Sequence, residues 1–295
     1  MSQMNRRGLS LVELLVALVI LGVVSAALYR VLVSNQRIYQ AQTQRIDLQQ
    51  NIRAAVTILP AEFRELDAYD GDILAMGPNS ITIRAFRVLG FICNAPNLPL
   101  LPLVGQQIIV RNSLLFGSRG FMAGSDSIMI YYEGDEGARA DDAWTAPTLL
   151  TASGSQNCPD GFAGTRLTLL TLNISPLPVP LVVNGLTRGS PVRAFEPVTY
   201  RLWQAPAPDS RYYIGLATTS GIQPLVGPIL ANGLSFAYYD STGAVTVVPT
   251  RVSSIGITVR AQTVQPVQVS AGSTTRAFAV DSITTRVALR NNRSF

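Results

Sequence analysis

The sequence predicts an α+β protein in which one long N-terminal helix carries a β-rich domain. Two features of the apolar pattern support this fold class. An apolar run over residues 14–33 is followed, up to residue 70, by apolar residues at steps of three and four, the spacing of one helix face. Beyond Gly71 the spacing changes to two, which is typical of half-buried antiparallel strands.

The first half of the predicted helix is long enough to cross a membrane. Between residues 9 and 33 the ionisable side chains are Glu13 and Arg30. About 20 mostly apolar residues span the roughly 30 Å hydrocarbon layer as a helix. Arg6 and Arg7 precede the run, and the positive-inside rule then leaves this short leader in the cytoplasm.

Glu13 stands out within this run. A carboxylate about a turn inside a spanning helix costs several kcal/mol unless it is paired or protonated, so we treat Glu13 as a functional residue. If the chain is cut after Gly8, the new α-amino group of Leu9 is the nearest cation, in the same helix or in a neighbouring one. The alternative interpretation is a secretory signal peptide cut near Ala27.

Residues 8–13, Gly-Leu-Ser-Leu-Val-Glu, and the apolar run behind them resemble the class III signal of type IV pilins and type II secretion pseudopilins. The resemblance implies a pilin-like fold, cleavage between Gly8 and Leu9 by prepilin peptidase, and N-methylation of Leu9 by the same enzyme. It also implies that Glu13 serves subunit docking in a filament. The spanning run contains no proline, whereas many major pilins have one there.

The charged residues exclude several kinds of chemistry. All 23 basic residues are arginine, and the chain contains neither lysine nor histidine. The absence of histidine excludes Ser-His-Asp and Cys-His nucleophile pairs and imidazole metal sites, and the absence of lysine excludes a P-loop and a Schiff base. The net charge is +5, but the arginines are scattered, so we expect a solvated surface and no nucleic-acid partner, metal or cofactor.

Two cysteines, Cys93 and Cys158, lie in the part of the chain predicted to be exported. An even count in an oxidising compartment favours one disulfide. The alternative is a pair of buried free thiols. A catalytic thiol is disfavoured because the chain has no histidine or lysine to lower its pKa.

Residues 34–70 are predicted to continue the helix outside the membrane as an amphipathic segment. Its apolar stripe consists of Leu48, Ile52, Ala55, Val56, Leu59, Phe63 and Leu66. Pro60 removes one backbone hydrogen bond and predicts a kink near Val56. Asp70 and Gly71 are predicted to end the helix.

Residues 71–295 are predicted to form the β-rich head, following the cleaved leader 1–8, the transmembrane segment 9–33 and the outer helix 34–70. The predicted strands are 81–88, 107–111, 127–132, 166–172, 198–203, 211–218, 234–239, 245–248, 253–261 and 281–290. The proline-dense segments 96–102 and 176–180 are predicted to be loops. The middle of the chain, residues 91–191, matches no pattern that we can assign and is predicted to be an insertion.

The order of strand motifs in the C-terminal half resembles the PilW/PulJ group of minor pilins and minor pseudopilins. The motifs are EPVTYRL at 196–202, LSFAYY at 234–239, IGITVR at 255–260 and TRVALRN at 285–291. The resemblance implies a non-enzymatic subunit that helps prime, or sits near the tip of, a type IV pilus or a type II secretion pseudopilus. The implied partners are prepilin peptidase, other minor and major pilins or pseudopilins, the inner membrane and the assembly platform, with the C-terminal domain in the periplasm.

Two other functions are considered beside this one. The first is a membrane-anchored periplasmic enzyme or binding module, since hydrolysis by paired carboxylates needs no histidine. Its candidate residues, all in turn-like contexts, are Asp126, Asp160 and Asp240. The second is a DNA-contacting minor pilin of a competence system, whose candidate residues are Arg84, Arg87, Arg111 and Arg119. No aromatic platform is interleaved with these arginines.

An acidic segment, residues 134–142, contains the potential oxygen ligands Asp135, Glu136, Asp141 and Asp142. Their spacing matches no EF-hand. We therefore expect a solvated acidic loop in preference to a calcium site.

Overall fold

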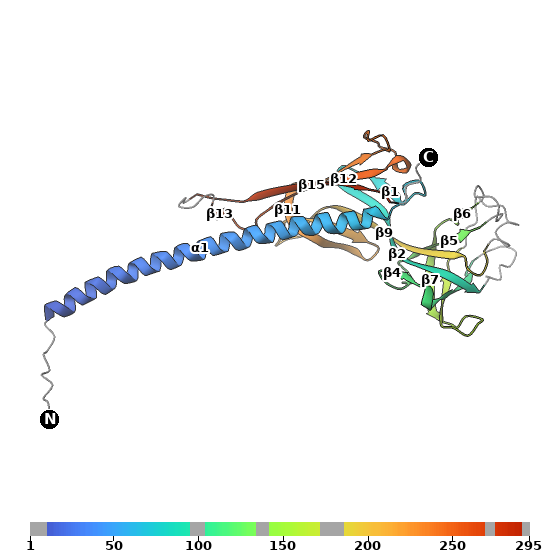
Figure 1. Ribbon diagram of the computed structural model, residues 1–295, viewed down its shortest axis with the longest axis horizontal. Coiled ribbons are helices and arrows are strands. Elements are labelled where there is room, and N and C mark those ends of the chain that lie inside the picture. Colours follow the sequence, from blue (N-terminus) through green and yellow to red (C-terminus); the bar gives the residue numbers. More distant parts are fainter. Residues whose placement is uncertain (1–10, 95–103, 134–141, 172–185, 269–274, 291–295) are drawn as a thin grey trace, which may run out of the picture.

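A computed structural model describes residues 11–94, 104–133, 142–171, 186–268 and 275–290. A single long helix, α1 (Leu11–Arg64), projects from a head built of antiparallel strands (Figure 1). This arrangement confirms the predicted α+β, pilin-like fold. The N-terminal end of α1 lies far from the head, and its C-terminal end is packed against the head (Figure 1).

α1 contains 54 residues and is about 81 Å long at 1.5 Å per residue. Its outer half packs on the sheet through one stripe of buried residues, which are Leu48, Ile52, Ala55, Leu59 and Phe63. The steps between them are three or four residues, so they share one helix face. The predicted apolar stripe is confirmed, except that Val56 is only half-buried.

The end of α1 differs from the prediction. The helix ends at Arg64 and not at Asp70 and Gly71. The carboxylate of Asp67 accepts hydrogen bonds from the backbone N–H groups of Tyr69 (3.0 Å) and Asp70 (3.2 Å), which turns the chain before a further helical turn can form. The predicted kink near Val56 is also wrong: α1 runs through Pro60 as one element and curves gently (Figure 1).

Strands make up most of the head. They are β1 (Ile73–Met76), β2 (Ser80–Asn94), β3 (Gln107–Arg111), β4 (Phe116–Gly117), β5 (Ser127–Tyr132), β6 (Ala143–Trp144), β7 (Thr148–Ser155), β8 (Gly164–Leu169), β9 (Pro191–Gln204), β10 (Tyr212–Thr218), β11 (Gly221–Tyr239), β12 (Ser254–Gln262), β13 (Val267–Gln268), β14 (Arg276–Ala277) and β15 (Val280–Ala288). Two short 3-10 helices, η1 (Asn112–Leu114) and η2 (Pro249–Arg251), lie between strands.

Two long strands that pair with each other, β2 and β9, run through both halves of the head. In the first half, the helix lobe, the antiparallel order is β1-β2-β9-β10-β11-β12-β15. α1 covers one face of this sheet. The buried side chains of α1 pack there with Ile81, Tyr200, Phe236 and Ile257, among others, in one continuous core.

In the second half, the barrel lobe, the strand pairings close on themselves. The cycle β2-β3-β8-β7-β5-β9 returns to β2, and each of its pairs is antiparallel. Closure satisfies the backbone groups that an open sheet leaves unpaired at its edges. The interior is a separate core that includes Val88, Ile108, Ile130, Leu150 and Leu167. Strands β3 to β8 are thus placed between β2 and β9 in sequence and beside them in space (Figure 1).

Most predicted strands are present, and one is absent. Residues 245–248 form no strand: Val245 makes an isolated bridge with Tyr239, and the side chains of Val245 and Val247 are exposed. Pro249 begins η2 directly afterwards, so the chain has no room to extend the pairing before it enters β12. β7 was not predicted from the sequence, because it has few buried residues and therefore no clear alternation.

Cys93 and Cys158 form a disulfide that ties the end of β2 to the segment between β7 and β8. Both cysteines are buried and pack with Ile109. The proline-dense segments 96–102 and 176–180 lie outside the described residues.

Candidate functional site

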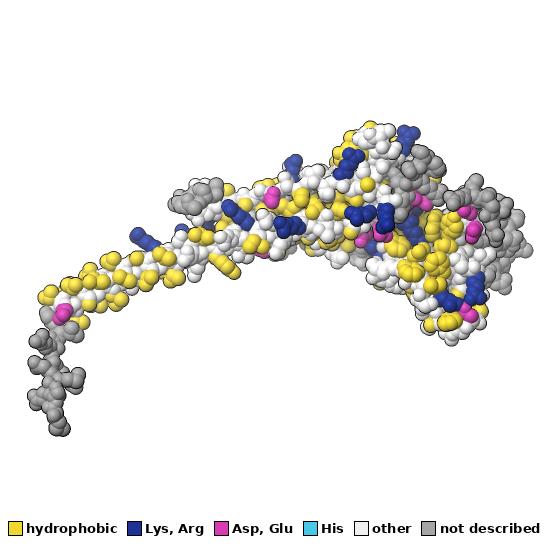
Figure 2. Space-filling view, in the orientation of Figure 1, with side chains coloured by type: hydrophobic (Ala, Val, Ile, Leu, Met, Phe, Trp, Pro, Cys, Tyr) yellow, Lys and Arg dark blue, Asp and Glu magenta, His cyan; other side chains and the backbone are white. Residues whose placement is uncertain are grey.

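The N-terminal half of α1 is the most unusual surface of the molecule. Every residue from 11 to 32 is exposed, although most of them are large and apolar, such as Leu11 and Val23. In the described part of the chain, α1 is the one helix long and apolar enough to cross a membrane. Figure 2 shows this apolar surface as a continuous stretch along the projecting helix. An apolar surface of this size is unfavourable in water, so we expect lipid or other helices to cover it.

Glu13 lies in the first turn of α1, within this apolar surface. The N-terminal end of a helix favours a carboxylate because its backbone N–H groups carry partial positive charge. Inside a membrane or a helix bundle Glu13 also needs a cation close by. The predicted cation, the amino group of Leu9, and the predicted cleavage site after Gly8 lie outside the described residues.

The exposed half of α1 also permits close helix packing. Ala17, Gly22, Ser25, Ala26 and Ala27 are exposed small residues, and a side chain added at Gly22 would meet no atom within 4 Å. Small residues allow neighbouring backbones to approach in the membrane. The helix is continuous through Gly22.

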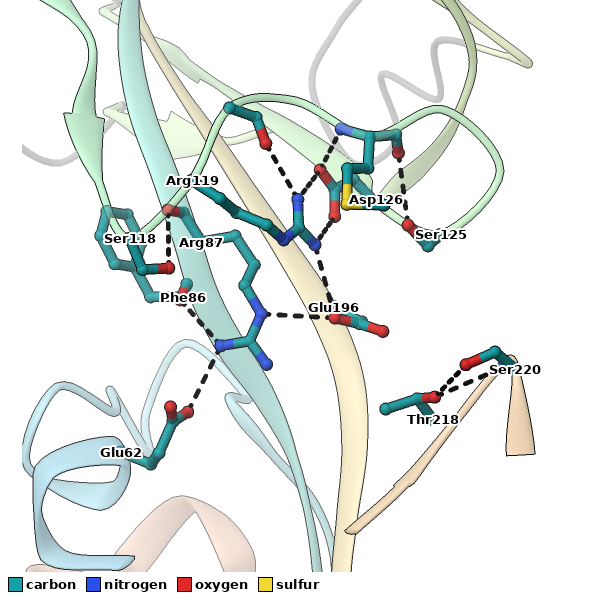
Figure 3. Close-up of polar contacts among 12 residues, drawn as sticks. Glu62, Phe86, Arg87, Ser118, Arg119, Ser125, Asp126, Glu196, Thr218 and Ser220 are labelled. Carbon is teal, nitrogen blue, oxygen red and sulfur yellow. Dashed lines mark hydrogen bonds and ion pairs between the residues drawn. The ribbon is translucent and has the colours of Figure 1, made fainter. Parts of the chain in front are cut away.

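A chain of ion pairs lies where α1 meets both lobes (Figure 3). Arg87 on β2 donates to Glu196 on β9 at 3.3 Å and to Glu62 on α1 at 3.5 Å. Arg119, in the loop before β5, donates to Glu196 at 3.4 Å and to both oxygens of Asp126, at 2.8 and 2.5 Å. The network therefore joins the last turns of the helix, the two long strands and one loop of the barrel lobe.

Asp126 is the most buried member of this network. Its side chain is 0% exposed, and it also accepts a hydrogen bond from the backbone N–H of Met122 at 2.7 Å. The hydrogen bonds from Arg119 to Asp126 raise the pKa of the Arg119 guanidinium above its usual value. Sequence reasoning missed this network, because its members come from distant segments and share no local spacing.

A second buried pair lies at the start of the head. Arg193 on β9 donates to the buried Asp72 at 2.6 Å, and the backbone N–H of Asp67 donates to the same oxygen at 3.0 Å. Arg84 lies close by and packs over the Phe195 ring, 5.3 Å from its centre. Burial lowers the pKa of Arg84 and raises that of Asp67.

The arginines considered for DNA binding are occupied within the head. Arg84 stacks on Phe195 and donates to the backbone oxygen of Asp70. Arg87 and Arg119 belong to the ion-pair network. Arg111 is paired with Asp160 and stacks on Phe162. These four residues do not form a common exposed basic face.

The aspartates considered for catalysis are held by separate partners. Asp126 is bound by Arg119, whereas Asp160 is bound by Arg111 and Arg188 near the disulfide. Asp240 lies in the helix lobe after β11, where the Thr242 hydroxyl and nearby backbone N–H groups lower its pKa. The structure does not bring two of them together as a carboxylate pair.

Of the acidic segment, Asp135, Glu136 and Asp141 lie outside the described residues, and Asp142 is described. Within the described ranges there is no group of three or more His, Cys, Asp or Glu side chains placed to hold a metal ion.

Comparison with known families places the chain's N-terminus in a recognised class. A family model described as the prokaryotic N-terminal methylation motif matches residues 3–29. The matched segment includes Gly8, Leu9 and Glu13 and extends into the exposed half of α1. No curated protein and no solved structure matches the chain.

The motif, the exposed apolar helix and the antiparallel head together support a protein of the type IV pilin and pseudopilin kind. Such a protein is a substrate of prepilin peptidase and a partner of other pilins. A single apolar N-terminal helix is consistent with anchoring in a membrane.

Proposed function

We propose that this protein is a minor pilin or minor pseudopilin, a non-enzymatic subunit that primes assembly of a type IV pilus or type II secretion pseudopilus, or lies near its tip. The observation that carries the proposal is the exposed half of α1, with Glu13 in its first turn and a methylation motif over residues 3–29. In this proposal the same surface has two roles. It anchors the subunit in the inner membrane, and it then packs against other helices in the filament.

The head supports a role at a specialised position. The barrel lobe adds a second core beyond the sheet that covers α1, and the ion-pair network joins it to that sheet. We infer that the barrel lobe is the periplasmic surface that distinguishes this subunit from its neighbours.

The enzymatic and DNA-binding alternatives receive no support from the described residues. The candidate carboxylates are separated, and the candidate arginines are already paired or stacked within the head. The resemblance to the PilW/PulJ group remains the basis for assigning a minor subunit.

The first test is the intact mass and N-terminal sequence of the protein recovered from membranes. Prepilin processing predicts a chain that begins with N-methyl-leucine at Leu9. A chain that still begins at Met1 in cells containing prepilin peptidase, or one cut near Ala27, would contradict the proposal.

The second test is Glu13→Ala. Cleavage after Gly8 should remain normal, because the change lies outside the scissile pair, while co-purification with partner subunits should fall sharply. Glu13→Gln is the matched control: it keeps the size of the side chain and should be equally defective if the charge is what docks. Normal assembly of both variants would remove the docking role of Glu13.

A further inference from the structure

A hollow lies between α1 and the β13–β14 ribbon. The ribbon leaves the sheet after β12 and runs beside α1 at the end of the head nearest the projecting half of the helix (Figure 1). It is held there by Gln44, whose side-chain oxygen accepts hydrogen bonds from the backbone N–H groups of Val264 (3.1 Å) and Gln265 (3.3 Å). Val267, on β13, is buried. These contacts hold one wall of the hollow against α1.

The hollow is basic and rich in amide groups. Its polar lining consists of Arg37, Gln40, Gln44, Gln265, Gln268 and Arg276. No carboxylate is among the described lining residues, and neither Arg37 nor Arg276 forms an ion pair with any residue that the structure describes. This contrasts with Arg87, Arg111 and Arg119, which are each paired.

The height of the hollow along α1 is set by helix geometry. The apolar run ends at Val33, so Arg37 lies about 6 Å farther along the axis at 1.5 Å per residue. The polar layer on each side of a bilayer is about 5–7 Å thick. When the apolar run spans the membrane, Arg37 and the adjoining rim of the hollow therefore lie at the level of the lipid headgroups.

Neighbouring side chains suit the same level. Tyr29 and Tyr39 are exposed on α1 on either side of the end of the apolar run. Aromatic residues are enriched at the boundary between membrane and water, where their rings contact both headgroups and acyl chains. Figure 2 shows dark blue side chains along the helix as it enters the head.

We propose that this hollow binds the phosphate group of an anionic phospholipid. Arginine guanidinium groups match phosphate with paired hydrogen bonds, and the glutamine amides add further donors. This inference rests on the membrane anchoring proposed above and adds the partner of the helix lobe at the membrane surface. The bound lipid would hold the head at a set height and rotation before the subunit leaves the bilayer for the filament.

The test uses the full chain in lipid nanodiscs of phosphatidylcholine that contain increasing fractions of phosphatidylglycerol. Native mass spectrometry after release from the nanodiscs counts the phosphatidylglycerol molecules retained on the protein. The double variant Arg37→Gln/Arg276→Gln should lower the apparent affinity for phosphatidylglycerol about 25-fold, because each basic residue near an anionic surface contributes about a factor of five. The matched control Arg201→Gln/Arg260→Gln removes the same charge from exposed positions on β9 and β12 and should behave as the wild type.

Equal retention by the wild type and the Arg37→Gln/Arg276→Gln variant would overturn the inference. A second result would also overturn it: the wild type shows no preference between the two lipids, and inorganic phosphate alone displaces the lipid. The hollow would then bind free phosphate. Alkaline extraction of sedimented cell membranes that contain the protein tests anchoring independently. Release of the wild type there contradicts the proposed function and this inference with it, whereas normal anchoring with no lipid preference contradicts only this inference.

Discussion

Replacing Arg119 with methionine should destabilise the barrel lobe. The change removes both hydrogen bonds from the guanidinium to Asp126, whose side chain is 0% exposed. Breaking a buried ion pair by removing one partner typically costs about 3–5 kcal/mol, because the other charge is left without compensation. This is a large part of the roughly 5–15 kcal/mol by which native domains are stable.

The two tryptophans allow the effect to be assigned to a lobe. Trp144 lies on β6 in the barrel lobe, and its ring contacts Tyr131 at 5.3 Å between centres. Trp203 lies at the end of β9 in the helix lobe, 6.1 Å from the ring of Tyr213. Guanidinium unfolding followed by fluorescence in Trp203→Phe, which retains Trp144, reports the barrel lobe. Unfolding in Trp144→Phe reports the helix lobe.

A double-mutant cycle separates the buried charge from loss of packing. Arg119→Met/Asp126→Asn removes both charges while keeping an oxygen for the backbone N–H of Met122, so it should be more stable than Arg119→Met alone. Arg201→Met, at an exposed arginine on β9, is the matched control and should change stability by less than about 1 kcal/mol. The reasoning would be refuted if Arg119→Met matched this control, or if the double variant were the less stable of the two.

The remaining predictions concern pH and the disulfide. Burial raises the pKa of Asp67 above 3.8, so ionising this residue costs more free energy in the folded than in the unfolded chain. The free energy of unfolding therefore falls as pH rises from 3.8 through the raised pKa of Asp67. Asp67→Asn should therefore stabilise the protein at neutral pH, and this gain should vanish below pH 3.8. Asp240→Asn should instead destabilise the protein at neutral pH, because a hydrogen bond from Thr242 lowers the pKa of Asp240. Thermal unfolding of both variants between acid and neutral pH checks that the two effects have opposite signs. Cys93→Ser/Cys158→Ser opens a loop with a sequence separation of 65 and should cost about 4 kcal/mol in the chain-entropy model, seen in the unfolding transition of Trp144. Reductant should shift the wild type towards this variant and leave the variant unchanged; an unaltered wild type under full reduction would contradict the estimate.

Local pattern was enough to predict the elements that depend on it. The stripe from Leu48 to Phe63 was visible as steps of three and four, and β3 and β5 were predicted with the bounds that the structure has. In each case a buried face imposes its own period on neighbouring residues. Glu13 was also identified from local sequence, because a single carboxylate in an apolar run can be recognised without any tertiary contact.

The errors lie where a local signal competes with a contact from elsewhere. The helix was predicted to continue to Asp70, but the Asp67 carboxylate caps a turn and Asp72 pairs with Arg193 from β9. The segment 245–248 was predicted as a strand, yet it forms only an isolated bridge between Val245 and Tyr239. The spacing of apolar residues indicates which secondary structure a segment favours, but tertiary contacts decide which one it forms.

The sequence by itself determined the exposed apolar helix, the methylation motif, the position of Glu13 and the change from helical to strand spacing. Each is written in consecutive residues, because it depends on periodicity and on the cost of charge in an apolar layer. The tertiary structure alone decided that β2 and β9 close a barrel, that Arg119 pairs with Asp126, and that Arg276 and Arg37 line one hollow. Those contacts join segments far apart in the chain, and the free energy that selects them comes from burying the whole core, which no local spacing records.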